Sequence, residues 1–180
     1  MPVPHARFVR PLIIILFALG IALLSHTWRS DASNTSELPE AWHSMTTAEV
    51  QLVPPDRLGV GGAPADTAAS TPRWLSVRVA DEPHERAQGM QHLPARVVRD
   101  HPIWFSFPTP RRVGWHMRNV RIPLDMAYIA ADGTVIAVER MVPNGTGYGI
   151  NEAIAAALEV AAGEAERLGI RPGTRLTLAD

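Results

Sequence analysis

The sequence predicts a mainly β protein: a small barrel- or sandwich-like β domain with one or two short helices, behind an N-terminal transmembrane or signal segment. Three observations support this prediction. Apolar and polar residues alternate over 74–80, as in a strand with one buried face. Two apolar, β-branched runs flank a turn at 131–133 that ends in glycine, as in a hairpin. An uncharged apolar run lies near the N-terminus.

Composition limits the chemistry that the chain can perform. Its 180 residues suffice for one domain with appendages, and a formal net charge of −1 predicts no nucleic-acid partner. Cysteine and lysine are both absent, which excludes thiol and amine nucleophiles. All 17 basic residues are arginines, so bidentate recognition of carboxylate or phosphate is available. No cofactor is predicted.

Residues 1–30 are predicted to be a signal anchor or a signal peptide. Arg7 and Arg10 precede the apolar run at 12–24, which is long enough for an export signal. An uncleaved anchor is favoured, with Trp28 at the far interface and the arginines in the cytoplasm. Cleavage at the small residues around 30–32, giving a secreted protein, is the alternative. The domain would then lie in the bacterial periplasm or at the cell surface, and the membrane would be its partner.

Residues 31–72 are rich in Ser, Thr, Ala, Pro and Gly and are predicted to be a flexible linker. Such a composition buries too little apolar surface to offset the entropy of ordering. Within it, residues 49–53 could form an isolated strand or a short turn of helix. The β-rich globular domain is therefore expected to span residues 73–180.

Within this domain the strand at 74–80 is followed by a helix that begins at 81–83 and continues to Gln88. Asp81 is the expected cap, and Pro83 fits the first turn. An aromatic strand is expected at 103–107, between two prolines. The hairpin strands are expected at 124–130 and 134–138.

The C-terminal part begins with a glycine-rich loop at 143–149 that matches no phosphate-binding motif. Residues 153–161 are ambiguous between helix and strand, because alanines favour a helix while apolar residues alternate with Glu159. A short helix at 163–169, closed by glycine, precedes a last strand at 175–178.

A polar cluster at the mouth of the hairpin is the candidate ligand site. Arg118, Asn119 and Asp125 combine a fork donor, an amide and an acceptor, and His116 stands beside them. They suit a small anionic or sugar-like ligand, or an envelope protein. In the structural alternative Asp125 pairs with an arginine and Asn119 satisfies turn backbone.

Other charged residues also have two interpretations. The segment from 96 to 121 contains one acid, Asp100, and six arginines, at positions 96, 99, 111, 112, 118 and 121. These arginines would form either an anion-attracting cleft or a solvated basic face. Glu85, Arg86 and Glu159 are expected to form a structural ion-pair set.

Two other classes of function are weighed against a binding module. A hydrolase-type enzyme could use Asp125 and His116 as an acid–base pair, although no GxSxG or HExxH motif is present and no catalytic residue is assigned. A periplasmic copper protein could use His84, His92, His101 and His116 with Met90 and Met117, but their spacing matches no ligand motif. No metal ligand is therefore assigned.

The chain resembles the domain of unknown function 192 family, also catalogued as uncharacterised protein family 0127. The resemblance covers about residues 74–178, and its most specific part is Met117-Arg118-Asn119 followed by Ile122-Pro123-Leu124-Asp125. It also includes Glu85-Arg86-Ala87 with Gly89, Ile103 to Phe107, Asp132-Gly133, Leu158-Glu159, Ala162-Gly163, Leu168-Gly169-Ile170 and Pro172-Gly173. It implies a small β-rich, barrel- or sandwich-like fold, often exported, with no established activity.

Overall fold

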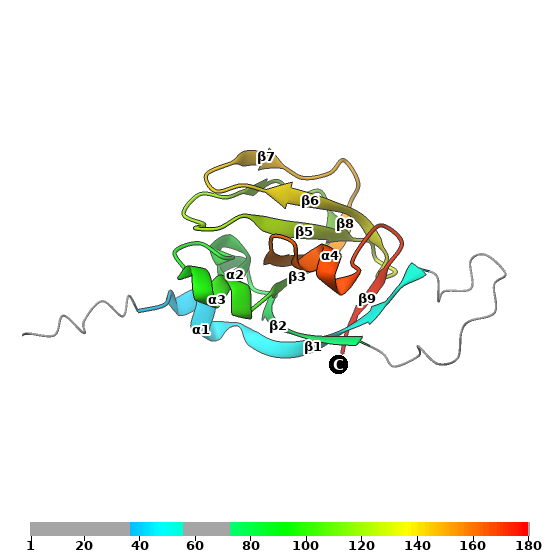
Figure 1. The fold of residues 1–180 in the computed structure, drawn as a ribbon, viewed down its shortest axis with the longest axis horizontal. Helices are drawn as coiled ribbons and strands as arrows, with labels where there is room; N and C mark the ends of the chain where they lie inside the picture. The colour runs from blue at the N-terminus through cyan, green and yellow to red at the C-terminus, as the bar shows by residue number, and fades with distance from the viewer. Residues whose placement is uncertain (1–36, 56–72, 180) are drawn as a thin grey trace, which may run out of the picture. The chain divides into compact units, whose positions relative to one another are not determined.

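The computed structural model describes residues 37–55 and 73–179, which form a mainly β domain, as predicted (Figure 1). A seven-stranded sheet has the order β6-β5-β8-β3-β2-β1-β9, and a two-stranded sheet pairs β4 with β7. The strands are β1 (Thr46–Val53), β2 (Arg73–Ala80), β3 (Ile103–Arg111), β4 (Trp115–His116), β5 (Leu124–Ile129), β6 (Val135–Met141), β7 (Thr146–Tyr148), β8 (Ile154–Ala161) and β9 (Arg175–Leu178). The helices are α1 (Glu40–Ser44), α2 (Pro83–Gln88), α3 (Ala95–Asp100) and α4 (Glu164–Leu168).

The large sheet curls until its two edge strands meet at one end. The backbone N–H of Val135, at the start of β6, donates to the carbonyl of Thr174 at 2.8 Å, and Leu176 of β9 donates to the carbonyl of Gly133 at 2.8 Å. A side chain at position 133 would place its Cβ 2.8 Å from the Leu176 carbonyl oxygen. Glycine is therefore required where the sheet folds back on itself.

Each face of this sheet carries its own apolar core. One core includes Val50, Leu158 and Val160. The other includes Phe105 and Ala157 and packs against helices and loops on the opposite face. Because side chains alternate along a strand, Glu159 of β8 lies on the same face as Ala157.

The expected linker at 31–72 is wrong for residues 40–53, which form α1 and β1. β1 pairs with β2 on one side and with β9 on the other, and it buries Val50 and Leu52. Local composition could not reveal this, because the partners of β1 lie far along the chain. The expected domain start at residue 73 moves accordingly to the N-terminal side of α1, while residues 56–72 lie outside the described part.

The expected signal or anchor segment at 1–30 also lies outside the described residues. Within 37–55 and 73–179, no helix is both long and apolar enough to cross a membrane.

Several elements differ in detail from expectation. The cap of α2 is Glu82 instead of Asp81, because Glu82 and Glu85 form a reciprocal capping box. The ambiguous segment 153–161 becomes strand β8, since it pairs with β3 and β5. The hairpin is confirmed, and the Asp132 carboxylate accepts the Thr134 N–H at 2.9 Å within its turn. The helix α3 and the short strands β4 and β7 were not predicted.

Candidate functional site

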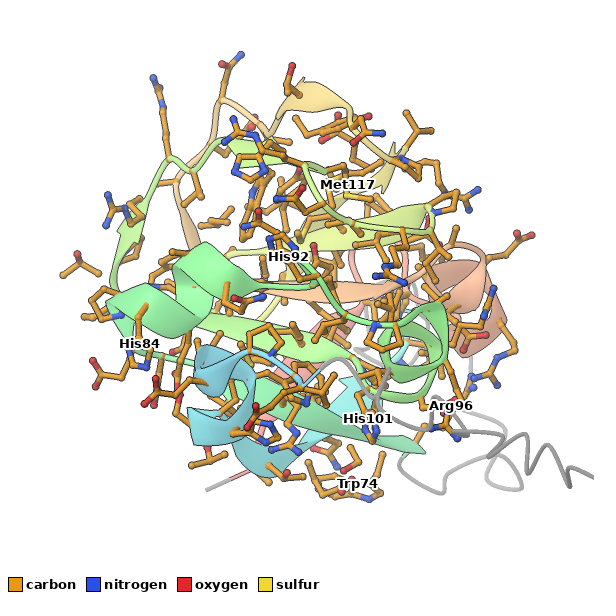
Figure 2. All side chains as sticks on the ribbon, turned by 90° about the vertical axis from the view of Figure 1, so that its left-hand side faces the viewer. Trp74, His84, His92, Arg96, His101 and Met117 are labelled. Carbon is orange, nitrogen blue, oxygen red and sulfur yellow. The ribbon has the colours of Figure 1, made fainter. Side chains whose placement is uncertain are left out.

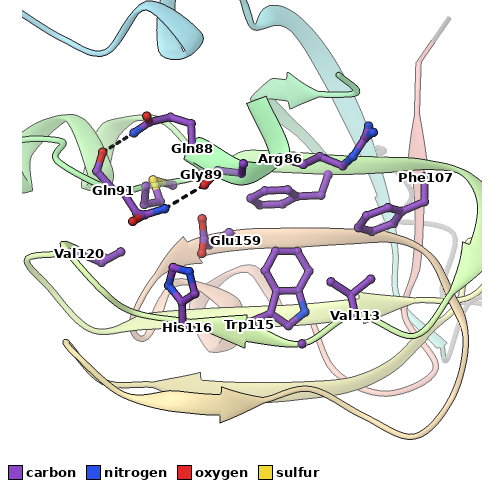
Figure 3. A pocket seen from close by; sticks show the side chains of 14 residues that line it. Arg86, Gln88, Gly89, Gln91, Phe107, Val113, Trp115, His116, Val120 and Glu159 are labelled. Atoms are coloured by element: carbon purple, nitrogen blue, oxygen red, sulfur yellow. Dashed lines mark hydrogen bonds between the residues drawn. The ribbon is translucent and has the colours of Figure 1, made fainter. Parts of the chain in front are cut away.

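A pocket of about 210 Å³ opens between the end of α2 and strand β4 (Figure 3). Strands β3 and β8 contribute Phe105, Phe107 and Glu159 to its lining. The turn after α2 contributes Gly89, and β4 contributes Trp115 and His116. These four segments thus meet around a single carboxyl group.

Glu159 is the polar centre of this pocket. Its side chain comes from β8 and lies near the turn at Gly89 and near His116 and Trp115 (Figure 3). The residue is only 5% exposed, and its Oε2 atom is buried without a hydrogen-bond partner. Burial raises the pKa of Glu159 to about 8, because the protein around it replaces the water that would stabilise the charged form.

Gly89 leaves the space above this carboxyl open. Its backbone has φ +46°, and its N–H donates to the Glu85 carbonyl at 3.0 Å. A Cβ at this position would lie 3.4 Å from the Phe105 ring and 3.7 Å from Glu159 Oε2. A larger residue would therefore be strained and would reach toward the carboxyl group.

Aromatic rings form one wall of the pocket. The Phe105 and Trp115 rings meet edge to face, with 4.8 Å between centroids and 76° between planes. The Arg86 guanidinium lies over the Phe107 ring, 5.8 Å from its centroid, and donates to the carbonyls of Ser106 and Asp81. The indole Nε1 of Trp115 is buried without a partner.

Of the four residues that the sequence proposed as a site, only His116 lines this pocket. His116 is exposed on β4, while its neighbour Met117 is fully buried in the core. Arg118 and Asn119 are both exposed in the turn that follows. Asn119 has φ +60°, and its carbonyl accepts the His92 N–H at 2.9 Å.

Asp125 belongs to a structural ion pair, as the alternative interpretation held. Its Oδ1 accepts from Arg140 Nε, and its Oδ2 accepts from the Gly163 N–H at 2.7 Å. Asp125 and Arg140 line a second pocket, which does not include His116. The structure therefore does not bring Asp125 and His116 together as an acid–base pair.

The expected ion-pair set of Glu85, Arg86 and Glu159 is wrong. Burial alone would raise the pKa of Glu85, but hydrogen bonds from the Glu82 backbone, Ser44 and Asp81 outweigh it and lower that pKa. Ser44 Oγ donates to Glu85 at 2.8 Å. Arg86 donates to backbone carbonyls, and Glu159 Oε2 has no partner.

Glu159 was missed as a site residue, although the sequence contains one signal for it. It is the one charged residue between 153 and 161, in a run that is otherwise apolar. A charge in such a run is costly unless it is paired or used.

The histidines and arginines singled out from the sequence are dispersed. Figure 2 shows His84, His92 and His101 at separate places on the domain. The Nε2 atom of His84 lies 3.2 Å from Ser44 Oγ, and the His101 ring packs edge to face on Trp42. Among residues 37–55 and 73–179, no three His, Cys, Asp or Glu side chains are grouped closely enough to hold a metal ion. The six arginines between 96 and 121 are all exposed.

Comparison with known proteins gives a family and two similar structures. Residues 65–178 match DUF192, which is described as an uncharacterized ACR. A Sinorhizobium meliloti 1021 protein, provisionally described as a transcription regulator, is 32% identical, with a TM-score of 0.61, over 75% of this chain and 95% of that one. A protein of unknown function from Novosphingobium aromaticivorans DSM 12444 is 23% identical, with a TM-score of 0.60, over 74% and 86%, and shares the fold. No curated protein matches the sequence.

Proposed function

The chain belongs to the DUF192 family, which is uncharacterized, and from its own geometry we propose that the pocket around Glu159 binds a small organic ligand. The observation that carries this proposal is the buried Oε2 atom of Glu159, which has no hydrogen-bond partner and belongs to a residue that lines the pocket. Burying an unpaired polar group costs free energy. A ligand that pairs with this oxygen would offset that cost.

The shape and lining of the pocket indicate the kind of ligand. A volume of about 210 Å³ is smaller than the roughly 300–1,000 Å³ of pockets for drug-sized molecules, so the ligand is fragment-sized. Phe105, Phe107 and Trp115 offer apolar contact to its body. Glu159 fixes the orientation of its polar end.

Methionine-methyl NMR of the full-length protein, titrated with a fragment library, tests this proposal. Met90 lines the pocket, whereas Met141 of β6 is buried elsewhere. Binders should shift the Met90 methyl resonance and leave that of Met141 in place. Failure of every fragment to shift Met90, with the protein folded, would contradict the proposal.

A catalytic role is a second candidate, because Glu159 and His116 line the same pocket. A carboxyl whose pKa is about 8 can give or take a proton near neutral pH. In this proposal the acid–base pair is Glu159 with His116 instead of Asp125 with His116. A hydrolytic activity that disappears in Glu159→Gln and persists in Asp125→Asn would support it.

We also propose that the domain lies outside the cytoplasm, tethered to a membrane. The support is the apolar run at 12–24 behind two arginines. Exposed Arg118 and Asn119 would then be available to an envelope protein or a sugar-like ligand. Carbonate-washed membranes should retain the full-length chain. A soluble product that starts near Ser33 would instead indicate cleavage.

A further inference from the structure

We propose that the ligand is an organic cation, an amine or guanidine on a compact apolar body, whose charged group pairs with Glu159 Oε2 against the aromatic wall. This inference rests on the proposed binding function and specifies the class of ligand. It follows from the unpaired acid group at the anchoring position, from the rings around it and from the positions of the neighbouring cations.

The anchoring group requires a donor, and no residue in the described ranges supplies one to Oε2. Carboxylate oxygens accept hydrogen bonds, and a charged donor forms the strongest of these in a site shielded from water. An ammonium or guanidinium group would supply both the hydrogen-bond donor and the countercharge. A ligand carboxylate would instead bring an uncompensated negative charge into the pocket and would leave Glu159 protonated.

The walls suit the same class of ligand. The faces of aromatic rings attract cations, and Phe105, Phe107 and Trp115 all line the pocket. This domain already uses such contacts twice: Arg86 lies over Phe107 at 5.8 Å, and Arg78 lies over Trp42 at 5.2 Å.

The neighbouring titratable groups do not pair with Glu159 Oε2, the atom that we assign to the charged group of the ligand. Arg86 of α2 extends toward Phe107 and away from Glu159 (Figure 3), held by backbone carbonyls. His116 of β4 is exposed to solvent. Tyr128 of β5 donates to Glu139 at 2.6 Å. None of these three side chains forms an ion pair or hydrogen bond with Oε2 of Glu159.

Pairing with a cation would ionise Glu159. Because burial holds the pKa of Glu159 at about 8, the free protein keeps this carboxyl protonated below that pH. Binding of an ammonium ion near pH 6.5 should therefore release about one proton from the protein. A neutral ligand of the same shape should release none.

The test compares benzylamine, benzyl alcohol and benzoate as probes of the full-length protein. Calorimetry in two buffers of different ionisation enthalpy measures affinity and proton release, and the Met90 methyl resonance locates binding. Benzylamine should bind at least about tenfold more tightly than benzyl alcohol, with proton release, and benzoate should bind least. Glu159→Gln should abolish the preference for benzylamine. Glu49→Gln, the same change on an exposed residue of β1, should preserve it.

The outcomes separate this inference from the binding function itself. If benzyl alcohol shifts Met90 and binds as tightly as benzylamine, without proton release, the pocket binds ligands but the cationic class is wrong. If no probe shifts Met90, the inference is overturned for these cations, and the fragment library decides the binding function. Retention of the benzylamine preference in a folded Glu159→Gln protein would also overturn the inference.

Discussion

At the scale of single residues, Glu159 connects the stability of the domain to pH. Its pKa is about 8 in the folded protein against 4.5 for the ordinary side chain. A carboxyl whose pKa is raised on folding contributes its full stability only below the pKa of the unfolded state. That stability is lost as the pH rises from the unfolded-state pKa through the folded-state pKa, because between these two values only the unfolded chain ionises freely.

We therefore expect the stability advantage of Glu159→Gln over the parent protein to be larger at pH 8 than at pH 4.5. The gain should reach about 2–5 kcal/mol in free energy of unfolding, since each pKa unit corresponds to about 1.4 kcal/mol. Urea unfolding of both proteins between these pH values measures the difference, with Glu49→Gln as the control. If the difference in free energy of unfolding between the variant and the parent does not change with pH, this carboxyl is not both buried and unpaired.

Asp125 and Arg118 were proposed together as ligand residues, and the structure gives them different roles. Asp125→Ala removes the partners of Arg140 and of the Gly163 N–H and should cost about 1–3 kcal/mol of stability. Arg118→Ala changes an exposed side chain and should stay within about 0.5 kcal/mol. Denaturation midpoints of the two variants test this contrast. Equal losses would contradict it.

The sequence allowed the structural role of Asp125 to be anticipated as one of two alternatives, because an acid in an apolar strand needs a partner. It did not identify Glu159 as a site, because the pocket depends on Gly89 and Trp115, which are distant in sequence. Whether a buried acid has a partner is decided by such distant neighbours.

At the scale of elements, the turn after α2 shapes the pocket. Gly89→Ala should cost about 1–2 kcal/mol, because φ is positive there, and should weaken benzylamine binding by crowding Glu159 Oε2. Gly147→Ala is the matched control, because its φ is +80° but a Cβ there would have no atom within 4 Å. Thermal unfolding and calorimetry should show lost stability in both variants and weaker binding only in Gly89→Ala. Unchanged binding in both would remove Gly89 from the site.

Strand prediction succeeded where a local signal was sufficient. The alternation over 74–80 and the turn at 131–133 identified β2 and the β5–β6 hairpin, and β9 was placed at its observed residues, 175–178. The alanines of β8 left helix and strand equally open until its pairing with β3 and β5 decided for strand.

At the scale of the whole molecule, the position of β1 determines where the domain begins. A chain that starts at Arg73 lacks the strand between β2 and β9, so Val77 and Leu176 would lose apolar neighbours. We expect this chain to lose cooperative unfolding, whereas a chain that starts at Glu37 should unfold in one transition. Circular dichroism during urea unfolding distinguishes the two. Equal stability of the two chains would mean that β1 is dispensable.

The same strand imposes an order on folding. β1 is the first strand of the described chain and β9 the last, yet they pair along residues 50–53 and 175–178. A polypeptide that emerges from a narrow channel with its N-terminus first cannot make this pairing until residue 178 has appeared. Contacts between distant segments also form slowly. Until β9 has appeared, the nascent chain therefore exposes an unpaired edge of β1, and a holding chaperone has time to bind it.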